Sequence, residues 1–172
     1  YKIYAGMIQN RLAKAIDADL DKTQYGFRKA RSTSNPLTCV RRLLDRAEAS
    51  KSPLVLTFLD WEKAFDRIKQ SKLMEALKRM SIPDQYINAI AALYDNPTFA
   101  VKGRGTESGW KRQSSGIRQG CPLSPYLFVI VMTVIFRDVE EGINLARGRV
   151  DGLSFAQLLY ADDTVLITNN VN

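Results

Sequence analysis

The sequence predicts an α+β fold in which an antiparallel sheet is packed by helices. Residues 53–59 form a nearly continuous apolar strand, and a strand without polar alternation is covered on both faces, so helices should flank the sheet. Residues 155–159 and 164–167 are two further strand-like stretches with two aspartates between them. Apolar residues elsewhere recur at helical spacing, which supplies the helices that the sheet needs.

The first helix occupies the start of the chain. Its apolar residues recur at helical spacing and comprise Ile3, Met7, Ile8, Leu12 and Ile16. No cap residue or initiator methionine precedes them. We therefore expect the chain to be a piece of a longer protein.

A basic turn and a second helix come next. Residues 28–31 hold three basic side chains in four positions, and Asn35 with Pro36 then opens the helix. Its apolar face comprises Leu37, Val40, Leu43 and Leu44.

Two helices should follow the strand at residues 53–59. The first covers residues 70–80, and Pro83 begins the second. The inward residues of the second are Tyr86, Ile87, Ile90 and Leu93. Both supply apolar faces for the same core.

The third quarter of the chain changes pattern. Short alternating stretches within residues 98–118 are split by Gly103 and Gly105, which indicates a β-hairpin. Ser124 and Pro125 then read as the N-cap and first position of an apolar helix over residues 126–140.

Length and charge limit the possible functions. The 172 residues suit one domain or part of a larger one, and 45% of them are apolar, enough for a packed core. A net charge of +7 and a pI of about 9.5 favour an anionic partner. The longest apolar run, residues 126–136, is shorter than the roughly 20 residues that cross a bilayer. No membrane partner is expected.

The chain contains no histidine, which excludes a Ser/His/Asp triad, a Cys/His pair and a His-ligated zinc. Cys39 and Cys121 are far apart and form no CxxC spacing. A reducing compartment fits these two cysteines. Any metal must bind to oxygen ligands, which favour Mg²⁺ or Mn²⁺.

Aspartates end the apolar strands. Asp60 follows residues 54–59, and Asp162 with Asp163 lies between the last two strands. A carboxylate at the end of a buried strand is costly to desolvate and needs a partner or a metal. The alternative is that Asp162 and Asp163 only supply the turn of a hairpin. Their pairing with Asp60 favours a site for a hard divalent cation.

Four stretches of this sequence resemble the motifs of reverse transcriptases. Residues 58–66, Phe-Leu-Asp-Trp-Glu-Lys-Ala-Phe-Asp, look like the first palm motif; residues 116–128, which contain Arg-Gln-Gly-Cys-Pro-Leu-Ser-Pro, look like the second; and residues 160–163, Tyr-Ala-Asp-Asp, look like the third. Residues 24–33 resemble the fingers motif upstream. Order and spacing agree, and the wording is most similar to non-LTR (LINE-type) retrotransposon enzymes.

This resemblance implies the right-hand polymerase fold, with the palm sheet packed by helices. Residues 1–50 correspond to partial fingers and residues 51–172 to the palm, as one continuous fragment. The thumb and the upstream fingers segment are expected to lie outside this sequence. Ala30 departs from the pattern, because relatives often have glycine there.

The resemblance also implies an activity. An RNA-directed DNA polymerase transfers a deoxynucleotidyl group to a primer 3′-hydroxyl, and Asp60, Asp162 and Asp163 would hold two Mg²⁺ ions, with Mn²⁺ as a possible substitute. Because the metals replace a protein base, histidine is not needed. Asp66 belongs to the motif, but a helix cap or an ion pair is its expected role.

Family likeness places further residues by the incoming nucleotide. Phe65 matches the aromatic that lies under the sugar and excludes a 2′-hydroxyl, although a core phenylalanine is the alternative. Gln119 and Gly120 match residues beside the nucleotide and the template base. Trp61 is a candidate for backbone contacts to the triphosphate.

The implied partners are an RNA template, a DNA primer and deoxynucleoside triphosphates. The candidates for contacts to the nucleic-acid backbone are Arg28, Lys29, Arg31, Lys102, Arg104, Lys111, Arg112 and Arg118. Each alone has the alternative of an ordinary surface residue. We expect a ribonucleoprotein in the cytoplasm and nucleus, and the oligomeric state stays open.

Two other functions are carried alongside. One is a catalytically incompetent nucleic-acid-binding remnant of the same domain. The other is a relative of telomerase or intron maturases, which the Arg-Gln-Gly-Cys-Pro-Leu-Ser-Pro string of residues 118–125 disfavours.

Overall fold

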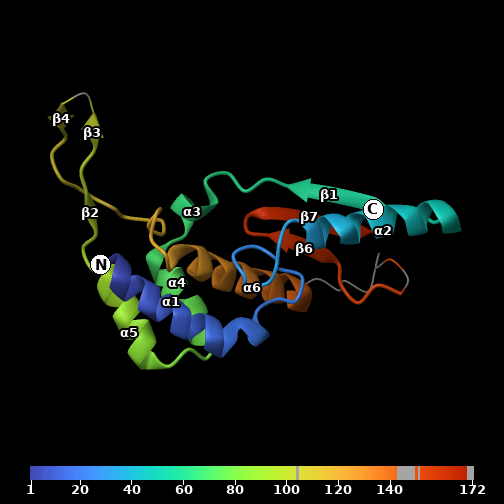
Figure 1. Ribbon diagram of the computed structural model, residues 1–172, viewed down its shortest axis with the longest axis horizontal. Helices are drawn as coiled ribbons and strands as arrows, with labels where there is room; N and C mark the ends of the chain where they lie inside the picture. The colour runs from blue at the N-terminus through green and yellow to red at the C-terminus, as the bar shows by residue number, and fades with distance from the viewer. Residues whose placement is uncertain (104, 143–149, 151, 170–172) are drawn as a thin grey trace.

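The computed structural model of the chain describes residues 1–103, 105–142, 150 and 152–169. It is elongated, with a bundle of helices at one end and a three-stranded sheet at the other (Figure 1). Helix α6 (Ser124–Gly142) runs from the bundle towards the sheet. Within the described part of the chain, none of the helices has the length and hydropathy needed to cross a bilayer.

The sheet consists of β1 (Val55–Leu59), β6 (Gln157–Tyr160) and β7 (Asp163–Thr168) in the order β1-β7-β6. All its pairs are antiparallel, and the β6–β7 hairpin pairs Tyr160 with Asp163. Its turn is therefore residues 161–162. The predicted antiparallel sheet and its terminal hairpin are confirmed.

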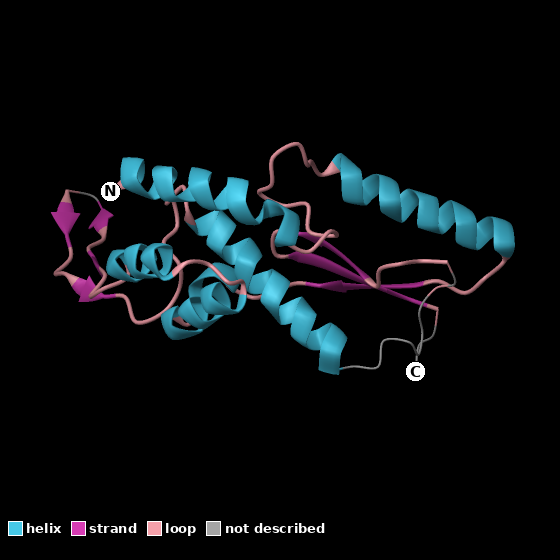
Figure 2. Cartoon of the chain, turned by 90° about the horizontal axis from the view of Figure 1, so that it is seen from below, coloured by secondary structure: helices cyan, strands magenta, loops and turns pink. Residues whose placement is uncertain are grey.

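Helices cover the two faces of the sheet, as predicted (Figure 2). On one face, Leu159 belongs to a large core together with the buried residues of α6, and Leu166 packs against it. On the other face, α2 (Ser34–Ser50) contributes Leu43 to a small cluster with Leu158 and Ile167. Successive strand residues point to opposite faces, so β6 and β7 feed both cores.

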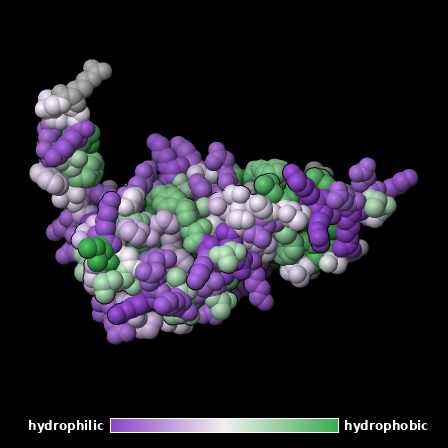
Figure 3. Space-filling model, in the orientation of Figure 1, coloured by the Kyte–Doolittle hydropathy of each residue, from purple (hydrophilic) through white to green (hydrophobic). Residues whose placement is uncertain are grey.

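Strand β1 does not have the predicted cover on both faces. Phe58 is 70% exposed and Leu59 is 36% exposed. The reason is that β1 is an edge strand, while α2 packs on β6 at the opposite edge. Hydrophobic surface is visible in this region of the molecule (Figure 3). The apolar run in the sequence thus predicted the strand correctly, but the prediction that both of its faces are buried is wrong.

The helical bundle contains α1 (Lys2–Ile16), α4 (Gln70–Arg79) and α5 (Asp84–Leu93), which share one core with α6. The predicted helices are confirmed, but the buried stripe of α1 differs from the expected one. Its buried residues are Ala5, Ile8, Leu12 and Ile16, whereas Ile3 and Met7 are exposed.

Helix α2 has the predicted position but a narrower apolar contact. Leu43 is its one buried residue, and Leu37 and Leu44 are about half exposed, at 57% and 50%. The small cluster beneath α2 does not reach these two side chains. The predicted four-residue apolar face is therefore wrong at Leu37 and Leu44.

The predicted hairpin within residues 98–118 is confirmed as an arm that projects from the bundle (Figure 1). Strand β2 (Thr98–Phe99) pairs with β5 (Lys111–Arg112), and β3 (Lys102–Gly103) pairs with β4 (Thr106–Glu107). Arg104 lies outside the described residues.

The start of α6 departs from the predicted cap. The helix begins at Ser124 itself, and the Ser124 hydroxyl is buried without a hydrogen-bond partner among the described atoms. Ser124 therefore does not act as the N-cap.

The basic turn keeps a backbone shape that suits glycine at Ala30, the position where this chain departs from the motif that it resembles. Ala30 has a φ of 59°, in the left-handed region that glycine adopts without steric cost. The backbone thus retains the conformation that a glycine would favour, even though this chain has alanine there.

Short helices complete the chain. The 3₁₀ helix η1 (Asp17–Asp19) follows α1, and α3 (Ala64–Arg67) follows β1. Helix α3 begins four residues after Asp60, which itself follows β1, so α3 is close in sequence to the predicted metal ligand.

Candidate active site

The strand register brings two of the predicted aspartates side by side. Leu59 pairs with Thr164. Asp60 follows Leu59 and Asp163 precedes Thr164, so the same antiparallel register places these two aspartates opposite each other. Asp162 is the next residue back, in the β6–β7 turn. All three lie at one end of the sheet, and all three are exposed.

Asp60 and Asp163 line a hollow of about 530 Å³ between the sheet and the beginning of α2. The same hollow is lined by the apolar residues Pro36, Leu37, Val40, Phe58, Leu158 and Val165, among others. The two carboxylates therefore stand at the rim of a mainly apolar groove that is large enough for part of a ligand.

No described residue neutralises these carboxylates. The side chains of Asp60, Asp162 and Asp163 make no hydrogen bond or ion pair with the described part of the chain. Adjacent carboxylates repel each other, and a divalent cation relieves that repulsion. In the chemistry of its donors, this set fits a hard divalent cation.

The three carboxylates are not gathered into a finished metal site. Within residues 1–103, 105–142, 150 and 152–169, no three Asp, Glu or Cys side chains are close enough to hold an ion. The residues that could hold one are Asp60, Asp162 and Asp163, because they share one end of the sheet and lack other partners.

Trp61 joins the chain after β1 to the neighbouring strand. Its indole Nε1–H donates a hydrogen bond of 3.0 Å to Oγ1 of Thr164, a buried residue of β7. Asp60 lies directly before Trp61, and Asp163 lies directly before Thr164. This hydrogen bond therefore fastens together the two segments that carry the opposed aspartates.

Phe65 packs within a set of aromatic rings. Its ring stacks on Phe128 of α6 at 4.4 Å between centroids with 8° between planes, and Phe27 meets it edge-on at 6.4 Å. This packing agrees with the core alternative and also holds the ring in one orientation.

A second hollow contains the other predicted nucleotide contacts. Its volume is about 700 Å³, and Arg118, Gln119 and Gly120 line it together with Asp66. Gln119 donates a hydrogen bond from Nε2 to Oδ1 of Asp66 at 3.0 Å. Asp66 is thus bonded to an amide and not to a lysine or arginine. The Arg118 guanidinium lies over the ring of Tyr1, 5.1 Å from its centroid.

Arg28 occupies a structural position, which corrects the expectation that it contacts nucleic acid. It is 7% exposed, and its Nε donates to Oδ1 of Asp17 at 3.0 Å. Its Nη1 donates to the main-chain carbonyls of Asp21 at 2.7 Å and Gln24 at 3.2 Å. A guanidinium engaged in this way has no free face for a phosphate.

Arg31 is also used within the protein. Its Nη1 donates to the carbonyls of Lys22 at 2.6 Å and Gln24 at 3.0 Å, and its guanidinium lies 5.3 Å from the centroid of the Tyr25 ring. Burial lowers the pKa of Arg31 from its usual value. Together, Arg28 and Arg31 hold the backbone of the motif in which they occur.

Sequence reasoning missed the residue that joins this motif to the aspartates. Gln24 is fully buried, and its side chain hydrogen-bonds the backbone of Ala161, between Tyr160 and Asp162. The signal in the sequence was the position of Gln24 in the stretch 24–33. A buried glutamine needs hydrogen-bond partners for its polar atoms.

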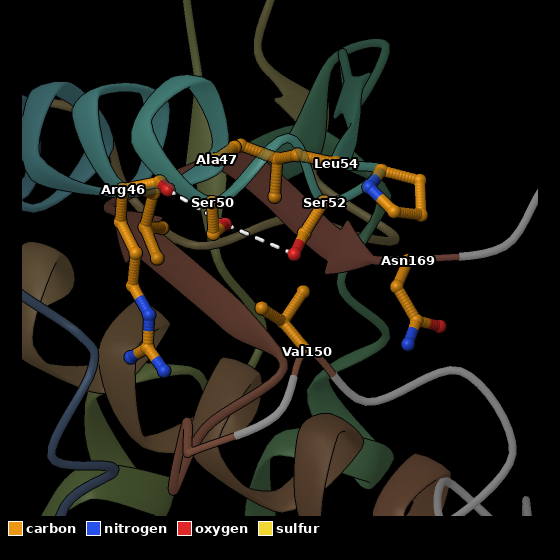
Figure 4. A pocket seen from close by; sticks show the side chains of 9 residues that line it. Arg46, Ala47, Ser50, Ser52, Leu54, Val150 and Asn169 are labelled. Carbon is orange, nitrogen blue, oxygen red and sulfur yellow. Dashed lines mark hydrogen bonds between the residues drawn. The ribbon is translucent and has the colours of Figure 1, made fainter.

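A third hollow lies away from these residues, between the end of α2 and the start of β1 (Figure 4). Its volume is about 180 Å³, and Arg46, Ser50, Ser52 and Leu54 help to line it. The Ser50 hydroxyl bonds to the Arg46 carbonyl at 2.8 Å and to the Ser52 hydroxyl at 2.9 Å. Because no carboxylate occurs among its described lining residues, it is not a candidate active site.

Comparison with known proteins gives consistent matches over the chain. The family model described as reverse transcriptase (RNA-dependent DNA polymerase) matches residues 1–172. The Pol polyprotein from the type-1 retrotransposable element R2 of Nasonia vitripennis is 30% identical over 148 residues, 86% of this chain. The RNA-directed DNA polymerase from the mobile element jockey of Drosophila melanogaster is 30% identical over 171 residues, 98% of this chain.

The matches concern one part of much longer proteins, since the chain spans 14% of the R2 polyprotein and 18% of the jockey polymerase. Among solved structures, apo telomerase from Candida tropicalis superposes with a TM-score of 0.68. That match covers 99% of this chain and 35% of the telomerase chain, at 16% identity. This likeness shows the polymerase right-hand fold and nothing more specific.

Proposed function

The chain belongs to the reverse transcriptase (RNA-dependent DNA polymerase) family, and from this premise we propose that it carries the nucleotidyl-transfer site of a retrotransposon polymerase. Its homologues are non-LTR retrotransposon proteins, R2 and jockey among them. The proposed reaction extends a DNA primer by deoxynucleotides along an RNA template. We assign residues 1–50 to partial fingers and residues 51–172 to the palm.

One observation carries the proposal. The register of β1 and β7 sets Asp60 opposite Asp163, beside Asp162, at an exposed sheet end where no described cation pairs with them. Such a set is unfavourable without a counter-charge. Reverse transcriptases use divalent metal ions, and we propose two Mg²⁺ ions at these three aspartates, with Mn²⁺ as a substitute.

The bound ions would lower the pKa of the primer hydroxyl and stabilise the departing pyrophosphate. The chain itself supplies the anionic ligands. The Trp61–Thr164 hydrogen bond holds the ends of two strands together, so the backbone beside Asp60 and Asp163 is set before any ligand arrives. We assign Trp61 a backbone contact to the triphosphate, and its hydrogen bond to Thr164 supports this because it fixes the chain beside Asp60. Positioning of this kind is a large part of catalysis of phosphoryl transfer.

Specificity for deoxynucleotides is assigned to Phe65. The stacking of its ring on Phe128 supports this role, because a steric gate must be held still to exclude a 2′-hydroxyl. We place Gln119 and Gly120 beside the incoming nucleotide and the template base. Gly120 supports this with a φ of 75° and no neighbouring atom within 4 Å of the Cβ that another residue would add.

Contacts to the template and primer backbone are assigned to basic residues of the arm and of the second hollow. Lys102, Lys111 and Arg112 lie on the projecting arm, and Arg118 lines the second hollow. Arg28 is left out because it is buried, and Arg31 is left out because it bonds two main-chain carbonyls and lies over the Tyr25 ring. Lys102 is kept because its ion pair with Glu107 is exposed. Phosphate contacts of this kind give affinity that falls steeply with salt.

The experiment is primer extension on an RNA template with Mg²⁺, using the longest available protein that contains these residues. Asp162→Asn should lower the extension rate by more than about 100-fold, since even residues that only support a metal ligand typically contribute 10- to 100-fold. Asp95→Asn, an exposed aspartate outside the site, is the matched control and should retain the wild-type rate.

An unchanged rate in Asp162→Asn would contradict the assignment. A wild-type protein that binds primer and template but does not extend them would instead identify an inactive nucleic-acid-binding remnant.

A further inference from the structure

We propose that Gln24 is a positioning residue for the aspartates of the β6–β7 turn, acting through the backbone of Ala161. The inference rests on the proposed function, because the effect concerns the metal-binding aspartates. Gln24 begins the stretch 24–33 and is 137 residues away from Ala161 in the sequence. Its side chain nevertheless holds the residue that directly precedes Asp162.

Both polar atoms of the Gln24 side-chain amide form hydrogen bonds with the backbone of Ala161. Its Oε1 accepts hydrogen bonds from the main-chain N–H of Ala161 at 2.9 Å and of Gly26 at 2.7 Å. Its Nε2 donates to the carbonyl of Ala161 at 3.2 Å. Gln24 thus binds both polar groups of one peptide residue, and it is itself completely buried.

Gly26 shows how closely the two segments approach. A Cβ added at Gly26 would lie 2.2 Å from the nitrogen of Ala161 and 2.8 Å from its Cα. Backbone atoms cannot move aside as a flexible side chain can. The contact therefore requires glycine. It sets the distance between the stretch 24–33 and the β6–β7 hairpin.

The main chain extends the same contact along β6. The Tyr25 N–H donates to the Leu159 carbonyl at 2.8 Å, and the Leu159 N–H donates to the Thr23 carbonyl at 3.0 Å. Residues 23–25 thereby bridge in parallel to the outer edge of β6. The edge of β6 that does not pair with β7 is thereby supported at Leu159, close to the β6–β7 turn.

Two arginines fix the position of Gln24 from the other side. The Gln24 carbonyl accepts hydrogen bonds from Nη1 of Arg28 at 3.2 Å and from Nη1 of Arg31 at 3.0 Å. The brace therefore runs from these arginines through Gln24 to Ala161. It gives Arg28 and Arg31 a positioning role.

Ala161 needs such support more than an ordinary turn residue. Its φ is 56°, in the left-handed region that non-glycine residues rarely adopt. Asp162 and Asp163 have no side-chain partner in the described chain, so only their backbone sets where the carboxylates point. Removing the brace should allow Ala161 to relax and change the direction of both side chains.

The test compares matched pairs of variants in the longest protein that contains these residues. Gln24→Met keeps the length of the side chain and removes its hydrogen bonds; Gln85→Met makes the same change at an exposed site on α5. Gly26→Ala introduces the clash with Ala161; Gly6→Ala adds a methyl group where nothing lies within 4 Å. Leu77→Ala, in α4, lowers stability away from the site.

Mn²⁺ binding is measured by electron paramagnetic resonance, and the Mg²⁺ concentration for half-maximal extension is measured in parallel. Gln24→Met and Gly26→Ala should each lower the affinity for Mn²⁺ and raise the Mg²⁺ concentration for half-maximal extension by about 10- to 100-fold. This is the usual effect of losing support for metal ligands. Gln85→Met, Gly6→Ala and Leu77→Ala should bind Mn²⁺ as the wild type does.

The inference is overturned if Gln24→Met loses thermal stability to the extent of Leu77→Ala but binds Mn²⁺ with unchanged affinity. Failure of the proposed function looks different, because the wild type would then bind Mn²⁺ and not extend a primer. A weaker Mn²⁺ affinity in Gln24→Met would still support the brace in that case.

Discussion

The two faces of the sheet are built from the same strands and differ in almost every physical respect. Towards α6, Leu159 is completely buried in the main core of the molecule. Towards α2, its neighbour Leu158 joins a cluster in which Leu43 and Ile167 are the other buried members among the described residues, and a hollow of about 530 Å³ opens beside it. One face holds the fold together, and the other leaves room for a ligand.

The alternation of strand residues explains how both faces can coexist. Successive side chains point to opposite sides, so β7 can place Leu166 against the core and Asp163 at the hollow. The exposed carboxylates therefore stand on a rigid support without being buried themselves. A site for charged ligands needs this combination, since burial would penalise the charges and disorder would misplace them.

The sharpest comparison of the two faces uses adjacent leucines of β6. Leu159→Ala should lower the free energy of unfolding by about 3 to 5 kcal/mol, because a tightly packed core cannot collapse around the lost atoms. Leu158→Ala should cost less, about 2 to 3 kcal/mol, because it belongs to the small cluster beneath α2 and not to the main core. Urea denaturation followed by circular dichroism measures both.

Both leucines are almost completely buried, at 0% and 2% exposure, so exposure alone does not distinguish them. Equal losses for the two variants would contradict the difference in packing between the faces.

A metal titration tests the charged end of the α2 face. Mg²⁺ at about five times its dissociation constant should stabilise the protein by about 1 kcal/mol, which corresponds to a rise in Tm of about 2 to 4 °C for a domain of this size. The double variant Asp60→Asn with Asp163→Asn should show no rise, because the opposed carboxylates are gone. Differential scanning calorimetry gives the shift.

Without Mg²⁺, the same double variant should be at least as stable as the wild type, since it removes like charges that no described residue neutralises. A clear loss of stability would show that these aspartates have a structural function.

The smallest effect is expected at the edge strand. Phe58→Ser should change the free energy of unfolding by no more than about 0.5 kcal/mol, since the side chain is already 70% exposed. Phe128→Ser is the contrast, because Phe128 is 1% exposed and belongs to the main core. Thermal unfolding of the two variants measures the difference, and a large loss for Phe58→Ser would mean that the α2 face is better packed than its exposure indicates.

The sequence by itself identified the strands, the main helices and the family. Regular spacing of apolar residues and the positions of proline and glycine are local signals, and they predicted α4, α5, α6 and the β6–β7 hairpin. The motifs around Asp60, Gln119 and Asp162 were readable for the same reason, since each is a short stretch of consecutive residues.

Burial and pairing required the tertiary structure. Phe58 looked like a core residue and is exposed, because position in the sheet and not local pattern decides whether a strand is covered. Arg28 looked like a phosphate ligand and is buried against Asp17. The hydrogen bonds between Gln24 and Ala161 join residues that are far apart in the chain. The spacing of residues within either segment does not predict them. Neighbouring residues determine local secondary structure, whereas long-range contacts form only when the chain folds.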